Sequence, residues 1–173
     1  MRVPQLLRTV TLLVTLSVAA GCDSELRSLV AGTDACGYCR MTIDDVRFGA
    51  LVRTAKGRLE TFDSIECAAS YVATLAPSLQ PQGIWVADFD HPSHWLDAKT
   101  ARFVQSTQLR SPMGRELAAF PADSTESALA GRFGGRSLGW TDVLAMSRTK
   151  LGLSPLRHAR PTLLAYALAN AGD

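Results

Sequence analysis

Hydrophobic positions gather in two short stretches near the start of the folded part of the chain, with polar positions between them. Residues 48–54 and 59–62 are rich in apolar and β-branched residues, which is typical of β-strands. Lys56 and Gly57 lie between them and supply a turn, so the pattern predicts a β-hairpin. A mainly apolar run over residues 84–89, interrupted by Asp88, predicts a further, buried strand.

Between the hairpin and that buried strand, the spacing of the apolar residues changes to that of a helix. Apolar side chains recur at helical spacing over residues 65–75, and Pro77 ends the pattern. Asp63, with Glu66 three residues later, fits the capping box that begins a helix. Cys67 lies beside the apolar face of this helix, where a buried cysteine behaves as a small hydrophobic residue.

The second half of the chain repeats this plan. Strands are expected at residues 95–98, 101–104, 116–120 and 137–139, and helices at residues 123–132 and 140–146. Asp123 and Glu126 form the capping pair of the first of these helices, and Gly134 and Gly135 end it. The order of hairpin, helix and strand therefore occurs twice. We predict an α+β fold in which two repeated ββαβ units, at about residues 36–90 and 91–149, form one compact domain.

The two ends of the chain differ in composition from this domain. Residues 1–21 combine arginines, an uncharged apolar run and small residues before Cys22, which predicts a signal peptide for export. The small residues followed by Cys22 resemble the lipobox of bacterial lipoproteins, so Cys22 is expected to carry the lipid. Residues 22–35 are predicted to be a lipidated tether, and residues 150–173, interrupted by prolines, an appended tail.

The charge balance of the exported chain excludes one class of partner. Removing Arg2 and Arg8 with the signal peptide leaves 16 Lys and Arg, which equals the number of Asp and Glu. Nucleic-acid binding relies on a basic surface. A neutral chain of this kind is therefore not expected to bind nucleic acid.

Three sulfur groups within six residues carry the chemistry: Cys36, Cys39 and Met41. If the chain is extended here, Cys39 and Met41 point to the same side, because side chains alternate along a strand. A thiolate and a thioether that converge on one point suit Cu(I), which soft ligands select. Cys36 is either a further sulfur ligand or the disulfide partner of Cys39.

Two other functions fit the same cysteines. Cys36 and Cys39 with His91 and His94 make a Cys₂His₂ set, which is common in structural zinc sites. A Cys-x-x-Cys pair also occurs in thiol–disulfide oxidoreductases, with Cys36 as the nucleophile. The redox function needs a helix that begins at Cys36, whereas the copper function needs an extended stretch from Cys39 to Met41. No arrangement of residues for hydrolytic catalysis is present in the sequence, and we do not expect an enzyme.

These motifs resemble, in order, those of the NosL family of accessory lipoproteins for nitrous oxide reductase. Residues 36–41 resemble its Cys-x-x-Cys-Gly-Met motif, with Arg40 in place of the usual glycine. The other matching segments are the Phe-Asp and later Cys of residues 59–67, an aromatic strand at residues 84–88, a Trp-x-Asp-Ala segment at residues 95–98, a Pro-Met-Gly loop at residues 112–114 with residues 118–120 behind it, and a Gly-Gly turn at residues 134–136.

The resemblance implies a function and a set of ligands. It implies a treble-clef-like fold and a periplasm-facing metallochaperone that binds one Cu(I) and delivers it for copper-site assembly, in denitrification, to nitrous oxide reductase. By resemblance the ligands are Cys39, Met41 and Met113, with Cys36 as a further candidate. Met113 lies in the loop of the second unit, so the expected site bridges the two halves.

Overall fold

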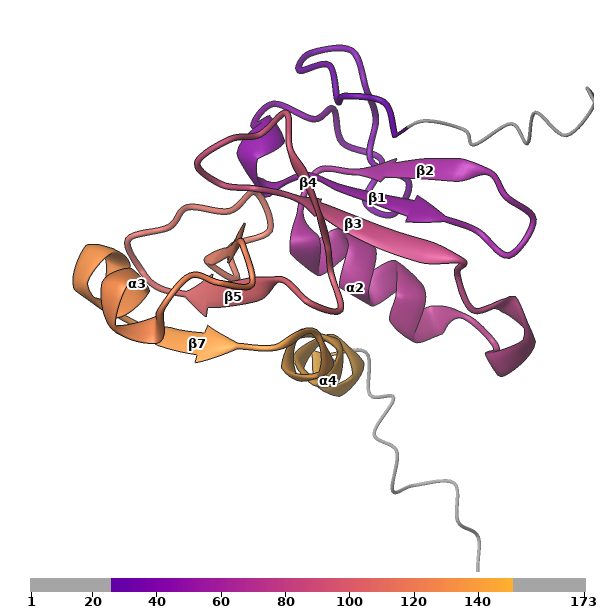
Figure 1. Cartoon of the computed structure of the whole chain (residues 1–173). Coiled ribbons are helices and arrows are strands. Elements are labelled where there is room, and N and C mark those ends of the chain that lie inside the picture. Colours follow the sequence, from indigo (N-terminus) through magenta and orange to yellow (C-terminus); the bar gives the residue numbers. More distant parts are fainter. Residues whose placement is uncertain (1–25, 151–173) are drawn as a thin grey trace, which may run out of the picture.

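The computed structural model describes residues 26–150, which form two antiparallel sheets and the helices around them (Figure 1). The predicted signal peptide, the lipid attachment at Cys22 and the tail after residue 150 lie outside the described residues. Within the described residues, no helix has the length and apolar character needed to cross a membrane.

The first sheet has four strands in the order β2-β1-β3-β4. The strands are β1 (Ala50–Arg53), β2 (Leu59–Phe62), β3 (Gly83–Ala87) and β4 (Trp95–Asp97). All three pairings are antiparallel, and Ala50 lies opposite Phe62 on one side and Val86 on the other. The predicted hairpin is confirmed, and its turn contains Gly57 with a φ of 83°, a conformation that suits glycine.

The second sheet has three strands in the order β6-β5-β7. They are β5 (Arg102–Gln105), β6 (Leu117–Phe120) and β7 (Arg136–Leu138). A parallel bridge between Asp88 and Ala119 joins the two sheets, and the Phe89 N–H donates to the Ala119 carbonyl at 2.9 Å. In both sheets the first hairpin strand pairs with the strand that follows the helix. The predicted α+β class is confirmed, and the interpretation as two repeated treble-clef-like units stays a prediction.

Three α-helices complete the described part of the chain: α2 (Ile65–Thr74), α3 (Glu126–Phe133) and α4 (Trp140–Lys150). Short 3-10 turns, η1 (Val46–Phe48) and η2 (Pro77–Leu79), lie before β1 and after α2. Helix α2 packs against β1, β2 and β6, and α4 packs against α2 (Figure 1). The first turn of α2 is therefore held between the two halves of the molecule.

Both predicted helix caps are wrong by one or two residues. Ser64 caps α2, accepting a hydrogen bond from the Cys67 N–H at 3.2 Å, and Thr125 caps α3, accepting from the Ala128 N–H at 3.3 Å. The hydroxyl that reaches the free N–H group is the one directly before the first helical residue. Asp63, which we expected to cap α2, is released from that role and is only 1% exposed.

The hydrophobic core has two parts. Phe62 and Phe103, both fully buried, contribute one ring from each sheet to the larger part. Cys36 and Cys67 also belong to this larger part. The smaller part is aromatic, and rings of Phe89 and Phe120 contact each other within it. Close packing of this kind fixes the position of the residues that the core encloses.

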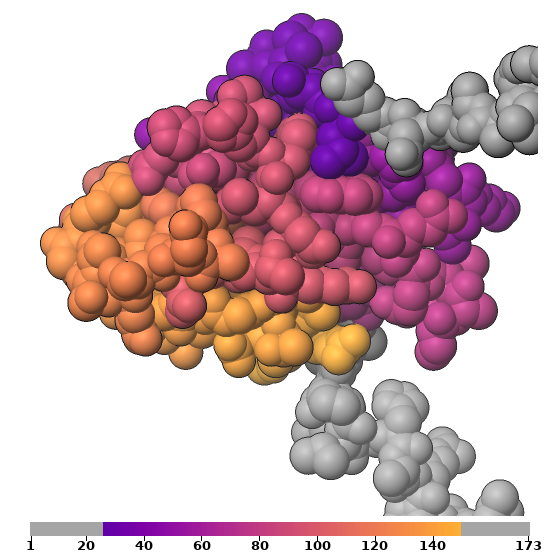
Figure 2. Space-filling model, viewed as in Figure 1, coloured from indigo at the N-terminus to yellow at the C-terminus, as the bar shows by residue number. Residues whose placement is uncertain are grey.

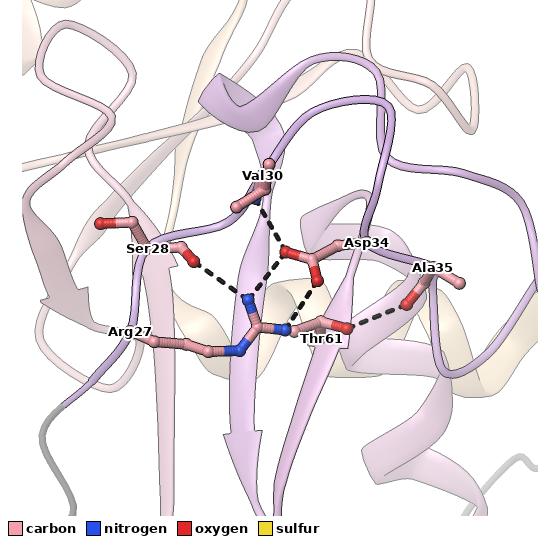
Figure 3. A network of polar contacts seen from close by, with 6 residues as sticks. All are labelled: Arg27, Ser28, Val30, Asp34, Ala35 and Thr61. Atoms are coloured by element: carbon pink, nitrogen blue, oxygen red, sulfur yellow. Dashed lines mark hydrogen bonds and ion pairs between the residues drawn. The ribbon is translucent and has the colours of Figure 1, made fainter.

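The stretch that we expected to be a tether folds onto the domain from Arg27 onward. Arg27 forms two hydrogen bonds of 2.8 Å with Asp34, whose carboxylate also accepts from the Val30 N–H (Figure 3). Thr61 on β2 donates to the Ala35 carbonyl at 2.9 Å. The described N-terminal residues, coloured indigo, gather at the top of the molecule (Figure 2). From Arg27 onward, the expected tether is therefore part of the folded domain.

Candidate metal centre

Four side chains from separate parts of the sequence meet at the start of α2. The potential ligand atoms of Cys36, Cys39, Asp63 and Cys67 all lie within 4.8 Å of one another. Cys36 and Cys39 come from the turn before β1, whereas Asp63 and Cys67 flank the start of α2. We call these four residues the thiol cluster. No other group of this kind occurs among residues 26–150.

Backbone hydrogen bonds hold the turn that carries the two N-terminal cysteines. The Cys36 N–H donates to the Met41 carbonyl at 2.8 Å, and the Arg40 N–H donates to the Cys36 carbonyl at 3.1 Å. The Gly37 N–H donates to the Thr61 carbonyl at 2.7 Å, which fastens the turn to β2. The turn thereby reaches the start of α2, because β2 leads directly into that helix.

The predicted extended conformation from Cys39 to Met41 is wrong. Arg40, between them, has a φ of 69°, in the left-handed region that L-residues rarely adopt. Strand alternation is broken there, and the Met41 side chain is 55% exposed. The glycine usual at this position in the family has no Cβ and adopts such a φ without strain. Arg40 keeps the same turn at the cost of backbone strain.

Helix α2 brings the other half of the cluster. Ser64 accepts the Cys67 N–H, so Cys67 lies in the first turn, where free N–H groups give the helix end a partial positive charge. The Cys39 thiol donates to Asp63 Oδ2 at 3.4 Å, while Asp63 Oδ1 is buried and has no hydrogen-bond partner among the described residues. The cluster thus holds a carboxylate oxygen that no described donor satisfies.

Cys36 and Cys67 form a coupled pair of thiols. A hydrogen bond from the Cys67 thiol is the main reason that the pKa of Cys36 is lowered, to about 6. Burial acts in the opposite direction. Three backbone N–H groups also lower this pKa, those of Asp63, Cys39 and Tyr38. Hydrogen bonding to Cys36 and burial together raise the pKa of Cys67. Ionisation is therefore favoured at Cys36 over Cys67.

Cys39 differs from that pair. Burial raises its pKa, and the charges of Cys36 and Asp63 contribute in the same direction. It is also half-buried, whereas Cys36 and Cys67 are 1% and 2% exposed. Of the three thiols, Cys39 is the one that solvent reaches.

The donor set suits a soft cation. Three thiols and one carboxylate resemble the sulfur-rich sets that bind Cu(I) or Zn²⁺. Tetrahedral sulfur ligands at a metal–sulfur distance of 2.3 Å lie about 3.8 Å apart. The spread of up to 4.8 Å in the cluster needs a contraction of only about 1 Å to match this geometry.

The structure separates the residues that the sequence predicts as ligands. Cys36 and Cys39 lie in the cluster, and Met113 is half-buried against the core that contains Cys36 and Cys67. Met41 is exposed, at the opposite end of the strained turn.

Sequence reasoning missed two members of the cluster. Cys67 was expected to be only a buried core residue, and Asp63 only a helix cap. The signal for both was present in the position of Ser64. A hydroxyl cap at Ser64 frees Asp63 and places Cys67 in the first helical turn beside it.

Two alternative functions lose their structural basis. His91 and His94 are exposed, with ring centroids 5.7 Å apart, and neither belongs to the cluster, so the Cys₂His₂ zinc set is not assembled. Residues 36–40 form a turn, and the first helical residue after them is Val46. The helix that a thiol–disulfide oxidoreductase motif needs at Cys36 is therefore absent from this described stretch.

The fold and the cluster together define a class: a small α+β domain with a thiolate-rich metal centre built from a turn and the first turn of a helix. The sequence model of the NosL family matches residues 29–147, and the chain belongs to that family.

Two solved structures are similar to the chain, and the first of them shares its fold. The crystal structure of the copper chaperone NosL from Shewanella denitrificans is 21% identical, with a TM-score of 0.55 over 68% of this chain and 94% of that one. The solution NMR structure of the apo-NosL protein from Achromobacter cycloclastes is 22% identical, with a TM-score of 0.42 over 64% of this chain and 94% of that one. A comparison with curated protein sequences found no match.

Proposed function

We propose that this protein is a periplasm-facing lipoprotein that binds Cu(I) at the thiol cluster and delivers it to a copper-recipient protein. The observation that carries the proposal is the convergence of Cys36, Cys39 and Cys67 within 4.8 Å, on a chain of the NosL family. Soft thiolate ligands favour Cu(I). The copper chaperone from Shewanella denitrificans, which shares the fold, supports copper as the cargo.

The exposure of the three thiols suggests an order of ligand exchange. Cys36 and Cys67 are almost fully enclosed, and Cys39 is half-buried. An incoming thiolate or imidazole of the recipient meets Cys39 first and replaces it as a copper ligand. The two enclosed thiols then release the ion in later steps. The reaction is an exchange of ligands on Cu(I), with no change of oxidation state and no enzymatic step.

The two methionines remain proposed ligands. Met113 packs against the core that contains Cys36 and Cys67, which supports its thioether as a ligand of Cu(I). Met41 is exposed and requires a rearrangement of the turn before it reaches the same ion. We therefore propose the three cysteines and Met113 as the principal ligand set, and Met41 as a thioether available during transfer.

The recipient and the location follow from the family. We propose nitrous oxide reductase, or a protein that assembles its copper site, as the recipient. Cys22 is the proposed point of lipid attachment after removal of residues 1–21, which places the domain at a membrane surface on the periplasmic side.

A Cu(I) titration of the exported chain, carrying Cys22→Ser and reduced by a thiol-free reagent without oxygen, tests the proposal. We expect one tightly bound equivalent and, because a ligand is lost, a weakening of more than about 100-fold in Cys67→Ser. Met113→Leu should also weaken binding, and Met41→Leu should do so less. Met146→Leu is the control, because Met146 lies on α4 and contacts Arg136.

Zinc is the competing cargo, because three cysteines and one aspartate are also a four-ligand zinc set. The titration is therefore repeated in the presence of equimolar Zn²⁺. Retention of Cu(I) supports the chaperone function. Displacement of Cu(I) by Zn²⁺, or unchanged Cu(I) binding in Cys67→Ser, overturns the proposal.

A further inference from the structure

Glu66 is a buried carboxylate in the first turn of α2, directly before Cys67. Its side chain is 4% exposed, and glutamates are rarely buried to this extent without a partner. Its partner is not a basic residue: the Ser111 hydroxyl donates to Glu66 Oε1. Burial raises the pKa of Glu66, against the hydrogen bond from Ser111. The contact joins residues that are 45 positions apart in the sequence.

Ser111 also organises the loop that contains Met113. Its hydroxyl accepts the Glu116 N–H at 2.9 Å, and its carbonyl accepts the Gly114 N–H at 3.0 Å. These two bonds close residues 111–116 into a compact loop. The bond to Glu66, together with the Arg115 backbone N–H directed at the same carboxylate, then fastens this loop to α2.

We propose that Glu66 is a positioning residue: it holds the loop of residues 111–116 on α2 and thereby keeps Met113 packed against the core that contains Cys67. Pro112 and Gly114, on either side of Met113, are exposed, so packing by its immediate neighbours does not hold the methionine in place. The importance for copper rests on the proposed function, but the fastening of the loop does not.

A merely structural role of Glu66 makes a different prediction. A glutamate in the first turn of a helix can also act only by supporting the helix start with its charge, and its loss then destabilises the whole domain without a specific effect on Met113. The distinguishing readout is therefore the reactivity of Met113 itself in the folded, copper-free protein. Methionine oxidation depends on the access of the oxidant to the sulfur atom.

The experiment measures the rate of sulfoxide formation at Met113 in the exported chain with dilute hydrogen peroxide, by peptide mass spectrometry. In Ser111→Ala, loss of the fastening hydrogen bond should raise the Met113 rate by about fivefold. The already exposed Met41 is the internal reference and should not change. Glu66→Leu should behave as Ser111→Ala does, and Glu66→Gln, which keeps an acceptor oxygen for Ser111, should stay close to wild type.

Ser106→Ala is the matched control. Ser106 is a buried serine of the same half, but its hydroxyl donates to the Phe133 carbonyl instead of to α2. An unchanged Met113 rate in folded Ser111→Ala, or an equal rise in Ser106→Ala, overturns the proposal. Ser111→Ala decides the matter even where Glu66→Leu does not fold.

Copper affinity provides a second, separable readout. Ser111→Ala should weaken Cu(I) binding in the wild-type background and have no further effect when Met113 is already leucine. Equal weakening in both backgrounds contradicts the assignment of the contact to Met113. If wild type binds no Cu(I), the proposed function fails, and the oxidation rates still decide whether Glu66 holds the loop.

Discussion

The thiol of Cys39 donates a hydrogen bond to Asp63 across 3.4 Å, from the N-terminal turn to the start of α2. The contact joins the one half-buried thiol of the cluster to a carboxylate that is 1% exposed. A negative charge at this distance disfavours ionisation of the thiol. Asp63 therefore adds to the effect of burial, which is the main cause of the raised pKa of Cys39.

Replacing Asp63 with asparagine should make Cys39 more reactive. Burial is the main cause of its raised pKa, but the charge of Asp63 acts in the same direction and is removed in the variant. We expect Cys39 to react with iodoacetamide at least about threefold faster at pH 8. Asp88→Asn is the control, because Asp88 is equally buried but accepts from the Asp90 N–H outside the cluster. Equal rates in Asp63→Asn and wild type would show that the charge has no effect.

The coupled thiols should give the reduced, metal-free protein a stability maximum near pH 8.5. Cys36 ionises at a pKa of about 6 in the folded chain and near 8.5 in the unfolded chain. Between these values the unfolded state holds the extra proton, so the free energy of unfolding rises with pH. Above about pH 8.5 it falls, because folded Cys67, with its raised pKa, keeps a proton that the unfolded chain loses.

Urea unfolding in a thiol-free reductant, at a series of pH values from about 5.5 to 9.5, checks this dependence of stability on pH. The series brackets the Cys36 pKa values of about 6 in the folded chain and about 8.5 in the unfolded chain. In Cys36→Ser the rise of the midpoint between those two pH values should disappear. Cys39→Ser should retain the rise. A wild-type midpoint that does not increase over this interval rules out the lowered pKa of Cys36.

Relieving the strain at Arg40 should stabilise the fold. Its φ of 69° costs a non-glycine residue about 1 kcal/mol, and Arg40→Gly removes most of that cost. We expect Tm to rise by about 3–5 °C in a thermal melt monitored by circular dichroism. Arg110→Gly, at an exposed arginine without a positive φ, should lower Tm or leave it unchanged. A fall of Tm in Arg40→Gly would mean that contacts of the arginine outweigh the strain.

Removing either helix cap should lower stability, but only one of the two removals should also weaken copper binding. Ser64→Ala and Thr125→Ala each remove a hydroxyl that accepts a helix N–H, so each should lower the free energy of unfolding by about 1 kcal/mol. Only Ser64→Ala should also weaken Cu(I) binding, because Ser64 orients the turn that carries Cys67. Denaturant unfolding and Cu(I) titration of both variants test this, and similar Cu(I) affinities in the two would contradict it.

The sequence predicted the elements of the fold better than it predicted the position of their side chains. The hairpin turn at Gly57 and the helix end at Gly134, with φ values of 83° and 64°, are fixed by local chemistry, and both were predicted. The helix beginnings were displaced, because Asp63 and Asp123 are good caps in isolation. In both helices the hydroxyl directly before the first helical residue accepts the free N–H instead, and spacing alone does not choose between two candidate caps that lie close together.

In the candidate site, too, the local sequence pattern was predicted better than the position of the side chains. The spacing of Cys36 and Cys39 was visible, whereas their approach to Cys67 depends on how the turn is fastened to β2. The extended geometry assumed for Met41 failed at Arg40, where a backbone angle that sequence pattern does not disclose redirects the chain. The ligand roles of Met41 and Met113 stay predictions for the titration to decide.

Because Arg27 is bound to Asp34, the linker between the proposed lipid on Cys22 and the folded domain is short. A free chain from Cys22 to Cys36 reaches about 50 Å when fully extended, but the stretch from Cys22 to Arg27 reaches only about 17 Å. With the shorter linker, the domain stays close to the lipid headgroups, whereas the longer linker would allow it to move much farther from them. If Cys22 carries the proposed lipid and the thiol cluster carries copper, the recipient meets the domain at the bilayer surface, which favours partners that are themselves anchored there.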